Sequence, residues 1–222
     1  MVNILHLGTV QAGLETAIFS WTREYQDRFE FQLFFPSGRP IPNNRNRIVK
    51  KFLAGDWDYL FMLDDDNFPI KNPFSMLDRN VDVVAGCYPG ADDRGIHFHV
   101  YDIIEGTNAF KFVSPEKREG LQQVDAIATG CMLIKRNVLE KMKKKKLIPF
   151  EDLFDGDGIL LNNEDMAFCM KCKKLGVRVH ADWNILCDHI KEVSLLDVIR
   201  LILEAARTGK AVVHSPTPEK IS

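Results

Sequence analysis

The first half of the chain alternates between two hydrophobic patterns. Short runs rich in β-branched, leucine and aromatic residues predict strands, and they span residues 2–8, 29–36, 58–69 and 81–90. The segments between them, 11–25, 43–55 and 72–80, have apolar residues at helical spacing or helix-ending signals and predict helices. Strands that alternate with helices predict an α/β fold, with a mostly parallel sheet and helices on both of its faces.

The second half has a different rhythm. Residues 92–115 alternate polar and apolar side chains around the turn 105–108, which predicts a small antiparallel β-ribbon inserted into the fold. Residues 122–146 predict a strand, a turn of small residues and a helix. They are followed by a loop and helix, a last strand and a closing helix with a wide apolar face, at 154–176, 177–190 and 194–208.

Composition limits the kind of protein. The 222 residues are 45% apolar and contain no internal repeat or linker, so we expect a single domain, 1–222. The net charge of −2 provides no general attraction for nucleic acids or anionic membranes. The apolar runs are too short, or too interrupted by charge, to cross a bilayer. Five cysteines without a secretory signal predict a cytoplasmic location and buried thiols rather than disulfides or zinc ligands.

Three adjacent carboxylates, Asp64, Asp65 and Asp66, follow an apolar strand. Like charges at the end of a buried strand cost stability unless a cation or hydrogen-bond donors neutralise them. Oxygen ligands two residues apart point to the same side of an extended segment and suit Mg²⁺ or Mn²⁺ carrying a diphosphate. A solvated acidic turn is the alternative interpretation, but ligands of open parallel sheets bind beyond the carboxyl ends of the strands, where these residues fall.

The segment 40–69, which contains these aspartates, resembles the core of a nucleotide-sugar-dependent glycosyltransferase of the GT-A type. It is similar to the broad inverting group called family 2, which has an Arg-Asn pair on the helix before an Asp-x-Asp strand end. The resemblance continues through 83–90, 124–142 and 162–189, so that four motifs occur in the expected order over roughly residues 3–190.

This resemblance implies a role for each matching residue. The donor-binding residues would be Thr9, Arg45, Asn46, Asp64, Asp65, Thr129 and Gly130. Asp66 and His189 would hold Mn²⁺ or Mg²⁺, and Asp64 would bond the ribose. Asp165 would be the catalytic base, with Glu164 beside it. The half up to about residue 90 would bind the nucleotide, and about 91–193 would face the acceptor. The opening segment departs from the family pattern, so Thr9, Val10 and Gln11 are all open as nucleotide contacts.

Sugar transfer needs these residue types on chemical grounds. A divalent ion offsets the charge that develops on the leaving diphosphate, and an acceptor hydroxyl attacks poorly unless a carboxylate takes its proton. Asp165 also has a structural interpretation, because Asn followed by acids is a common helix start. If Asp165 is not the base, Asp155 and Asp157 in the preceding loop are the next candidates.

Three other features have a plain interpretation and an alternative. His97 and His99 are interpreted as polar positions of an exposed hairpin, although they could point at a substrate. The lysine run 143–146 is interpreted as a solvated helix end, with a site for a phosphate-bearing acceptor as the alternative. The helix 194–208 is interpreted as core packing, with a homo-oligomer surface as the alternative.

The sequence therefore predicts a metal-dependent glycosyltransferase, with inversion favoured. The resemblance favours a UDP-sugar donor, and the acceptor is open between a glycan, a lipid, a protein and a modified nucleobase. A nucleotidyltransferase acting on sugar phosphates is one alternative, although residues 8–16 lack the basic residue expected around a triphosphate. A non-catalytic module that binds a sugar nucleotide or a carbohydrate is the other.

Overall fold

The computed structural model describes residues 1–5, 12–38, 40–92, 95–107, 109–113, 118–191 and 194–208. The chain divides into two compact units, Met1–Ile190 and Lys191–Ser222. The first unit contains the central sheet and the predicted site residues, and the second contains the C-terminal helix. The predicted nucleotide contact Thr9 lies outside the described residues.

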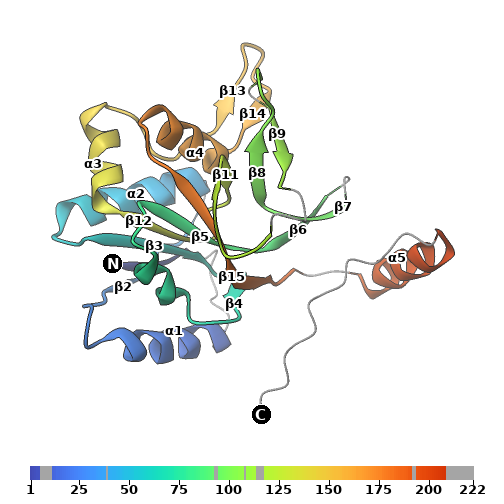
Figure 1. Ribbon diagram of the computed structural model, residues 1–222, viewed down its shortest axis with the longest axis horizontal. Coiled ribbons are helices and arrows are strands. Elements are labelled where there is room, and N and C mark those ends of the chain that lie inside the picture. The colour runs from blue at the N-terminus through green and yellow to red at the C-terminus, as the bar shows by residue number, and fades with distance from the viewer. Residues whose placement is uncertain are drawn as a thin grey trace. The chain divides into compact units, whose positions relative to one another are not determined.

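The first unit is built around one large sheet (Figure 1). Its main path has the strand order β10-β15-β5-β12-β3-β1-β2, and β4 pairs with β15 beside that path. The strands are β1 (Val2–Leu5), β2 (Leu33–Phe34), β3 (Tyr59–Asp64), β4 (Asn67–Pro69), β5 (Val83–Cys87), β10 (Leu121–Val124), β12 (Cys131–Lys135) and β15 (Val179–His189).

The prediction of a mostly parallel sheet is wrong, because the sheet is mixed. β1 runs parallel to β2 and β3, and β15 runs parallel to β5. β12 lies between β3 and β5 and is antiparallel to both, and β15 is antiparallel to β10 and β4. Parallel neighbours need a crossover connection, usually a helix. The chain from β5 to β12 passes through short strands instead, so it re-enters the sheet in the opposite direction.

Helices cover both faces of this sheet, as predicted. They are α1 (Ala12–Tyr25), α2 (Ile41–Ala54), the 3₁₀ helix η1 (Pro73–Arg79), α3 (Arg136–Lys144) and α4 (Glu164–Lys174). Side chains alternate along a strand, so Leu60 and Met62 of β3 join one core cluster and Phe61 and Leu63 join the other. α2, α3 and α4 pack into the first cluster, and α1 and η1 pack into the second.

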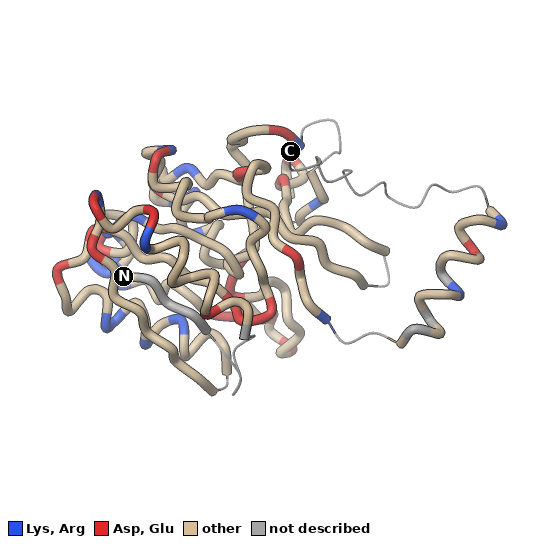
Figure 2. Tube along the Cα trace, turned by 90° about the horizontal axis from the view of Figure 1, so that it is seen from below, with Lys and Arg blue, Asp and Glu red and all other residues tan. Residues whose placement is uncertain are grey.

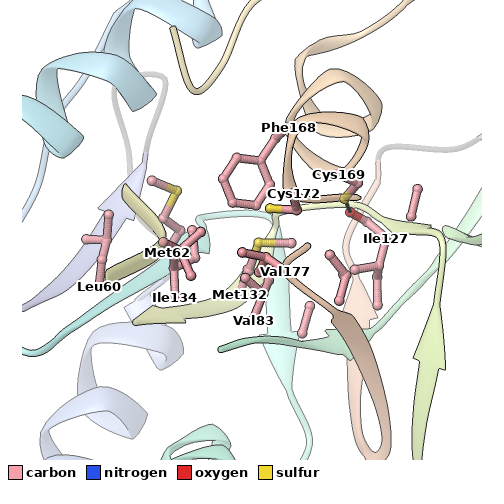
Figure 3. Packing of buried hydrophobic residues seen from close by; sticks show 14 of the residues in the cluster. Leu60, Met62, Val83, Ile127, Met132, Ile134, Phe168, Cys169, Cys172 and Val177 are labelled. Atoms are coloured by element: carbon pink, nitrogen blue, oxygen red, sulfur yellow. Dashed lines mark hydrogen bonds between the residues drawn. The ribbon is translucent and has the colours of Figure 1, made fainter. Parts of the chain in front are cut away.

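Figure 3 shows the first cluster from close by. Phe168 and Cys172 on α4 point toward the side chains of Met132 and Ile134 on the sheet. The thiol of Cys169 donates to the carbonyl oxygen of Ile127 at 3.5 Å. All five cysteines are free and buried, which confirms the expectation of buried thiols.

The predicted antiparallel insertion is confirmed, but it consists of more than one ribbon. β6 (Pro89–Asp92) pairs with β7 (Gly95–Phe98), and β8 (Val100–Ile103) forms a hairpin with β9 (Phe110–Phe112) and also pairs with β11 (Ala126–Ile127). A further hairpin, β13 (Leu153–Phe154) and β14 (Leu160–Asn162), precedes α4.

The second unit contains α5 (Leu195–Thr208), which confirms the predicted C-terminal helix. Four large apolar side chains on it are more than half exposed: Leu196, Ile199, Ile202 and Leu203. No helix among the described residues is long and apolar enough to cross a membrane. A packing or oligomer-forming role for α5 stays a prediction, as does the single-domain organisation.

Candidate functional site

The three aspartates do not share one extended segment. β3 ends at Asp64, and Asp65 and Asp66 form a turn that leads into β4. This turn sends Asp64 and Asp66 to different partners, described below, while Asp65 is half-buried. The expectation that Asp64 and Asp66 point to one side of a strand is therefore wrong, because the strand ends before the second of them.

Arg45 of α2 is the centre of a buried charge cluster. Its side chain is 3% exposed, and its Nη2 lies 3.0 Å from Oδ2 of Asp64. Its Nε lies 3.5 Å from Oε1 of Glu164, and its Nη2 lies 3.9 Å from Oδ1 of Asp165. One guanidinium from the motif on α2 thus faces the end of β3 and the acidic pair at the start of α4. The structure brings together four of the predicted site residues at this point.

The cluster changes the protonation behaviour of its members. Burial by itself lowers the pKa of Arg45, but the charges of Asp64, Asp165 and Glu164 more than offset this and raise the pKa above its usual value. Burial raises the pKa of Asp64, while the charge of Arg45 opposes the rise. Burial, reinforced by the charge of Asp165, raises the pKa of Glu164 to about 7. Arg45 therefore stays charged, and Glu164 exchanges a proton near neutral pH.

Some polar atoms of this cluster are left for a ligand. Nε and Nη1 of Arg45 and Oδ1 of Asp64 are buried and, within the described part of the chain, have no hydrogen-bond partner. Buried polar groups without partners are rare and costly in folded proteins. Among the described residues, Arg45 thus has two nitrogens without a hydrogen bond, of which Nε still pairs with Glu164, beside a carboxylate oxygen without one, and a hydroxylated or anionic ligand would complete this arrangement.

Asp66 and His189 form a second pair. β15 pairs with β4 in a register that places His189 opposite Asn67, next to the turn. Nε2 of His189 lies 3.3 Å from Oδ2 of Asp66, and Nδ1 of His189 lies 2.7 Å from the carbonyl oxygen of Pro89. A proton on Nδ1 donated to that carbonyl leaves the Nε2 lone pair directed at Asp66, which is the tautomer that a metal ligand needs.

The pair fits a divalent ion with few protein ligands. Adjacent ligands of an octahedral Mg²⁺ or Mn²⁺ are roughly 3 Å apart, because the metal–ligand distances are about 2.1 Å. Among the described residues, no group of three or more His, Cys, Asp or Glu side chains is arranged to hold a metal ion. An ion at Asp66 and His189 would therefore complete its shell with water and ligand oxygens, as Mg²⁺ commonly does at phosphate sites.

The small-residue turn between β11 and β12 contacts the Arg45 cluster. Thr129 is fully buried, and its hydroxyl donates a hydrogen bond to Oδ1 of Asp165. The carbonyl oxygen of Gly130 accepts from the backbone N–H of Asp64 at 2.9 Å. Thr129 was predicted to bind the donor, but its hydroxyl is directed at the predicted base.

The start of α4 is organised so that its two acids are not needed as caps. The side chain of Asn163 is the N-cap and accepts from the backbone N–H of Met166. The backbone N–H of Glu164 donates to Oδ1 of Asp152 at 3.0 Å. With these N–H groups satisfied by other side chains, the carboxylates of Glu164 and Asp165 turn to Arg45. This favours the functional interpretation over a helix start alone.

Asp155 and Asp157, the alternative candidates for the base, lie in the β13–β14 hairpin turn. Asp155 closes the turn of the β13–β14 hairpin, where its Oδ1 accepts from the backbone N–H groups of Asp157 and Ile159 at 2.9 and 2.8 Å. Asp157 is exposed in the same turn. The predicted donor contact Asn46 uses its amide in two hydrogen bonds with the backbone of Phe150. None of these contacts joins the Arg45 cluster.

Sequence reasoning missed Tyr88, which contacts both His189 and the small-residue turn beside the Arg45 cluster. Its ring lies edge-on to the imidazole of His189, with centroids 5.0 Å apart, and its hydroxyl oxygen accepts from the N–H of Gly130 at 3.3 Å. Burial and then the charges of Asp165 and Asp64 raise the pKa of Tyr88 well above its usual range, so the phenol stays neutral. Its position just after a buried strand, β5, was the available signal.

The two ribbon histidines also lie near this site. His97 is 7% exposed and stacks on Phe112 with centroids 3.9 Å apart, so its interpretation as an exposed polar position is wrong. His99 is half-buried, and its ring centroid lies 6.1 Å from that of His189. β7 pairs with β6 so that His97 lies opposite Gly90, and the backbone N–H of His99 donates to the carbonyl oxygen of Tyr88. The period-two pattern could not show these contacts.

No family model and no curated protein matches the sequence. Among solved structures, the chain is similar to the crystal structure of A197 from STIV, with 21% identity, a TM-score of 0.54 and coverage of 86% of this chain and 85% of that one. At this identity the likeness shows a common fold and says nothing of activity.

Two fainter likenesses are to enzymes. One is to GalNAc-T7 with UDP, GalNAc and Mn²⁺, with 10% identity, a TM-score of 0.49 and coverage of 87% of this chain but 44% of that one. The other is to the inositol-1-phosphate CTP transferase from T. maritima, with 10% identity, a TM-score of 0.45 and coverage of 95% and 98%. Both TM-scores are below 0.5, so neither likeness carries a conclusion about the activity of this chain. Membership of the family 2 group stays a prediction.

Proposed function

We propose that this protein is a divalent-metal-dependent glycosyltransferase of the GT-A type that moves a sugar from a nucleotide-sugar donor to an acceptor hydroxyl, with inversion. The observation that carries the proposal is the convergence of Arg45 with Asp64, Glu164 and Asp165 at the carboxyl end of β3. Two buried carboxylates and a half-buried one around one buried cation are costly to maintain, and such costs concentrate at functional sites.

The donor end of the proposed site is at Asp64 and Asp66. Mn²⁺ or Mg²⁺ held by Asp66 and His189 would offset charge on the leaving diphosphate. Asp64 keeps one oxygen on Arg45, and its Oδ1 is without a hydrogen-bond partner among the described residues. That oxygen is suited to accept from a ribose hydroxyl. A UDP-sugar is the donor class we favour, on the resemblance of the sequence.

The acceptor end of the proposed site is at Asp165. Thr129 and Arg45 both lie at Oδ1 of this carboxylate, so its orientation is fixed and Oδ2 is left to take the acceptor proton. Glu164 lies beside it with a pKa raised to about 7, by burial and by the charge of Asp165. We assign the base to Asp165 and treat Glu164 as the neighbouring acid that tunes the charge of the pair.

The proposal is tested by identifying the product that leaves. The protein is incubated with Mn²⁺ and a panel of sugar nucleotides, with and without candidate acceptors, and the nucleoside diphosphate is quantified. A parallel incubation contains Mn²⁺, nucleoside triphosphates and sugar phosphates, and the pyrophosphate is quantified. We expect metal-dependent release of the nucleoside diphosphate, by transfer or by slow hydrolysis. Asp165→Asn should retain donor affinity in calorimetry and lose roughly a hundredfold in rate. Asp157→Asn, at an exposed turn position, is the matched control and should keep the wild-type rate.

Two outcomes would contradict the proposal. Formation of pyrophosphate from a nucleoside triphosphate and a sugar phosphate would identify a nucleotidyltransferase. Tight donor binding without any turnover over the whole panel would identify a binding module.

A further inference from the structure

A groove between α2 and α3 lies outside the site described above. It has a volume of about 600 Å³, within the range of roughly 300–1,000 Å³ that is usual for small-molecule sites. Figure 1 shows the two helices side by side on one face of the sheet. The groove is lined by Asn46, Val49, Lys50, Leu53, Ala54, Leu139, Lys143, Lys146, Leu147, Ile148 and Pro149.

The floor and the rim of the groove differ in chemistry. The floor is aliphatic and includes no aromatic ring, and Ile148 is 54% exposed in it. Among the described residues that line it, the one side-chain amide is that of Asn46, which is already bonded to the backbone of Phe150. The rim has three exposed lysines, Lys50, Lys143 and Lys146. An apolar floor below a cationic rim is complementary to a ligand with an aliphatic part and a compact anionic group.

The lysines of the rim have no acid to neutralise them. Among the described residues, Lys50, Lys143 and Lys146 form no ion pair, and no Asp or Glu lines the groove. The acids nearest to Lys143 and Lys146 along the chain have other partners, since Glu140 pairs with Arg136 at 3.4 Å and Glu151 pairs with Lys171 at 2.6 Å. Further exposed cations lie on the same two helices and just after α3: Arg47, Lys51, Lys141, Lys144 and Lys145. Figure 2 marks the charged residues along the trace, and acidic residues are common outside these two helices.

This chemistry selects one occupant. A nucleic acid would use stacking rings, which the groove lacks, and a bilayer surface would meet a convex face rather than a groove. We propose that the groove binds a single-chain anionic amphiphile, with its aliphatic chain on Val49, Leu53 and Leu139 and its phosphate group among the three lysines. Lysine ammonium groups are common phosphate ligands as point charges. This proposal does not rest on the proposed transferase activity.

The test uses dodecyl phosphate as a monomer in solution, titrated into the full-length protein by calorimetry. We expect saturable binding with one molecule per chain. Affinity should fall roughly fourfold for each methylene removed in the decyl and octyl analogues, because about 0.8 kcal/mol is gained per buried methylene. Uncharged dodecyl maltoside should bind at least about tenfold more weakly than dodecyl phosphate, because it leaves the lysines without an anion.

Variants locate the binding in the groove. Lys50→Glu combined with Lys143→Glu reverses the charge of two of the three rim lysines. Ile148→Glu puts a carboxylate at an exposed position of the floor. Neither change disturbs a buried side chain. Each should weaken dodecyl phosphate binding at least about tenfold. Lys71→Glu, an exposed lysine that does not line the groove, is the matched control and should leave the affinity unchanged. Asp66→Ala should also leave it unchanged, because Asp66 belongs to the other site.

Three results would overturn the proposal. One is an affinity that does not depend on chain length or on the rim and floor variants. Another is binding that occurs only to anionic vesicles and never to the monomer. The third is concentration-dependent self-association, seen by analytical ultracentrifugation and lost in Ile148→Glu, which would show that a second copy of the chain covers the groove.

Discussion

The buried hydroxyl of Thr129 donates a hydrogen bond to Oδ1 of Asp165, so the turn before β12 fixes the carboxylate at the start of α4. The two residues come from segments that are far apart in the sequence, and both lie within reach of the turn at the end of β3. A hydrogen bond to a carboxylate is worth more than a neutral one, about 1.5–3 kcal/mol. Because this bond orients the proposed base, losing it should affect the rate of transfer more than the affinity for the donor.

We expect Thr129→Val to lower the transfer rate about tenfold while the donor affinity measured by calorimetry stays within about twofold. Thr129→Ser keeps the hydroxyl and should keep most of the rate. Equal losses of rate in the two variants would show that the methyl group of Thr129, and not its hydrogen bond, matters.

The Asp66–His189 pair predicts a graded loss of metal binding. Asp66→Ala should weaken Mn²⁺-dependent donor binding at least about a hundredfold, and His189→Ala less, about tenfold. Both are measured by calorimetry of the donor with and without Mn²⁺. Asp188→Ala removes an exposed acid next to His189 and should change neither value. If His189→Ala alters the melting temperature alone, the imidazole is structural.

The raised pKa of Glu164 predicts a pH-dependent stability. Burial and the charge of Asp165 raise the pKa from 4.5 to about 7 in the folded state, so between these values the folded protein holds a proton that the unfolded chain has released. The free energy of unfolding should therefore fall as the pH rises from about 4.5 to about 7, by at most about 1.4 kcal/mol per pH unit for one proton. Urea unfolding of the metal-free protein across this range, compared with Glu164→Gln, isolates the effect. A wild-type curve parallel to that of the variant would contradict the assignment.

We predict that any side chain at Gly130 destabilises the fold for steric reasons. A Cβ at this position would overlap Nδ2 of Asn67 and would come within 2.8 Å of the Tyr88 hydroxyl. Gly130→Ala should lower the stability by about 1–3 kcal/mol and lower the melting temperature accordingly. Gly156→Ala is the control, because a Cβ there meets no atom within 4 Å. Equal melting temperatures for the two variants would refute the steric argument.

The sequence by itself predicted the elements and part of the site. Short apolar runs identified β3 and β5, and helical spacing or helix-ending signals identified α1 and α2, because local sequence patterns reflect which side of an element is buried. The motif residues Arg45, Asp64 and Asp165 were identified by chemistry and resemblance, and they lie together in the structure. The roles assigned to all of the predicted site residues stay predictions.

Only the tertiary structure decided the sheet direction and the partners of the site. The antiparallel placement of β12 depends on the path of the chain through the insertion, which no local pattern records. The pairing of Thr129 with Asp165, of Asp66 with His189, and the position of Tyr88 depend on strand register, because one residue of slip turns a side chain to the other face. Register is set by the packing of the whole core, and this is why the chemistry of single residues could be predicted from the sequence while their contacts could not.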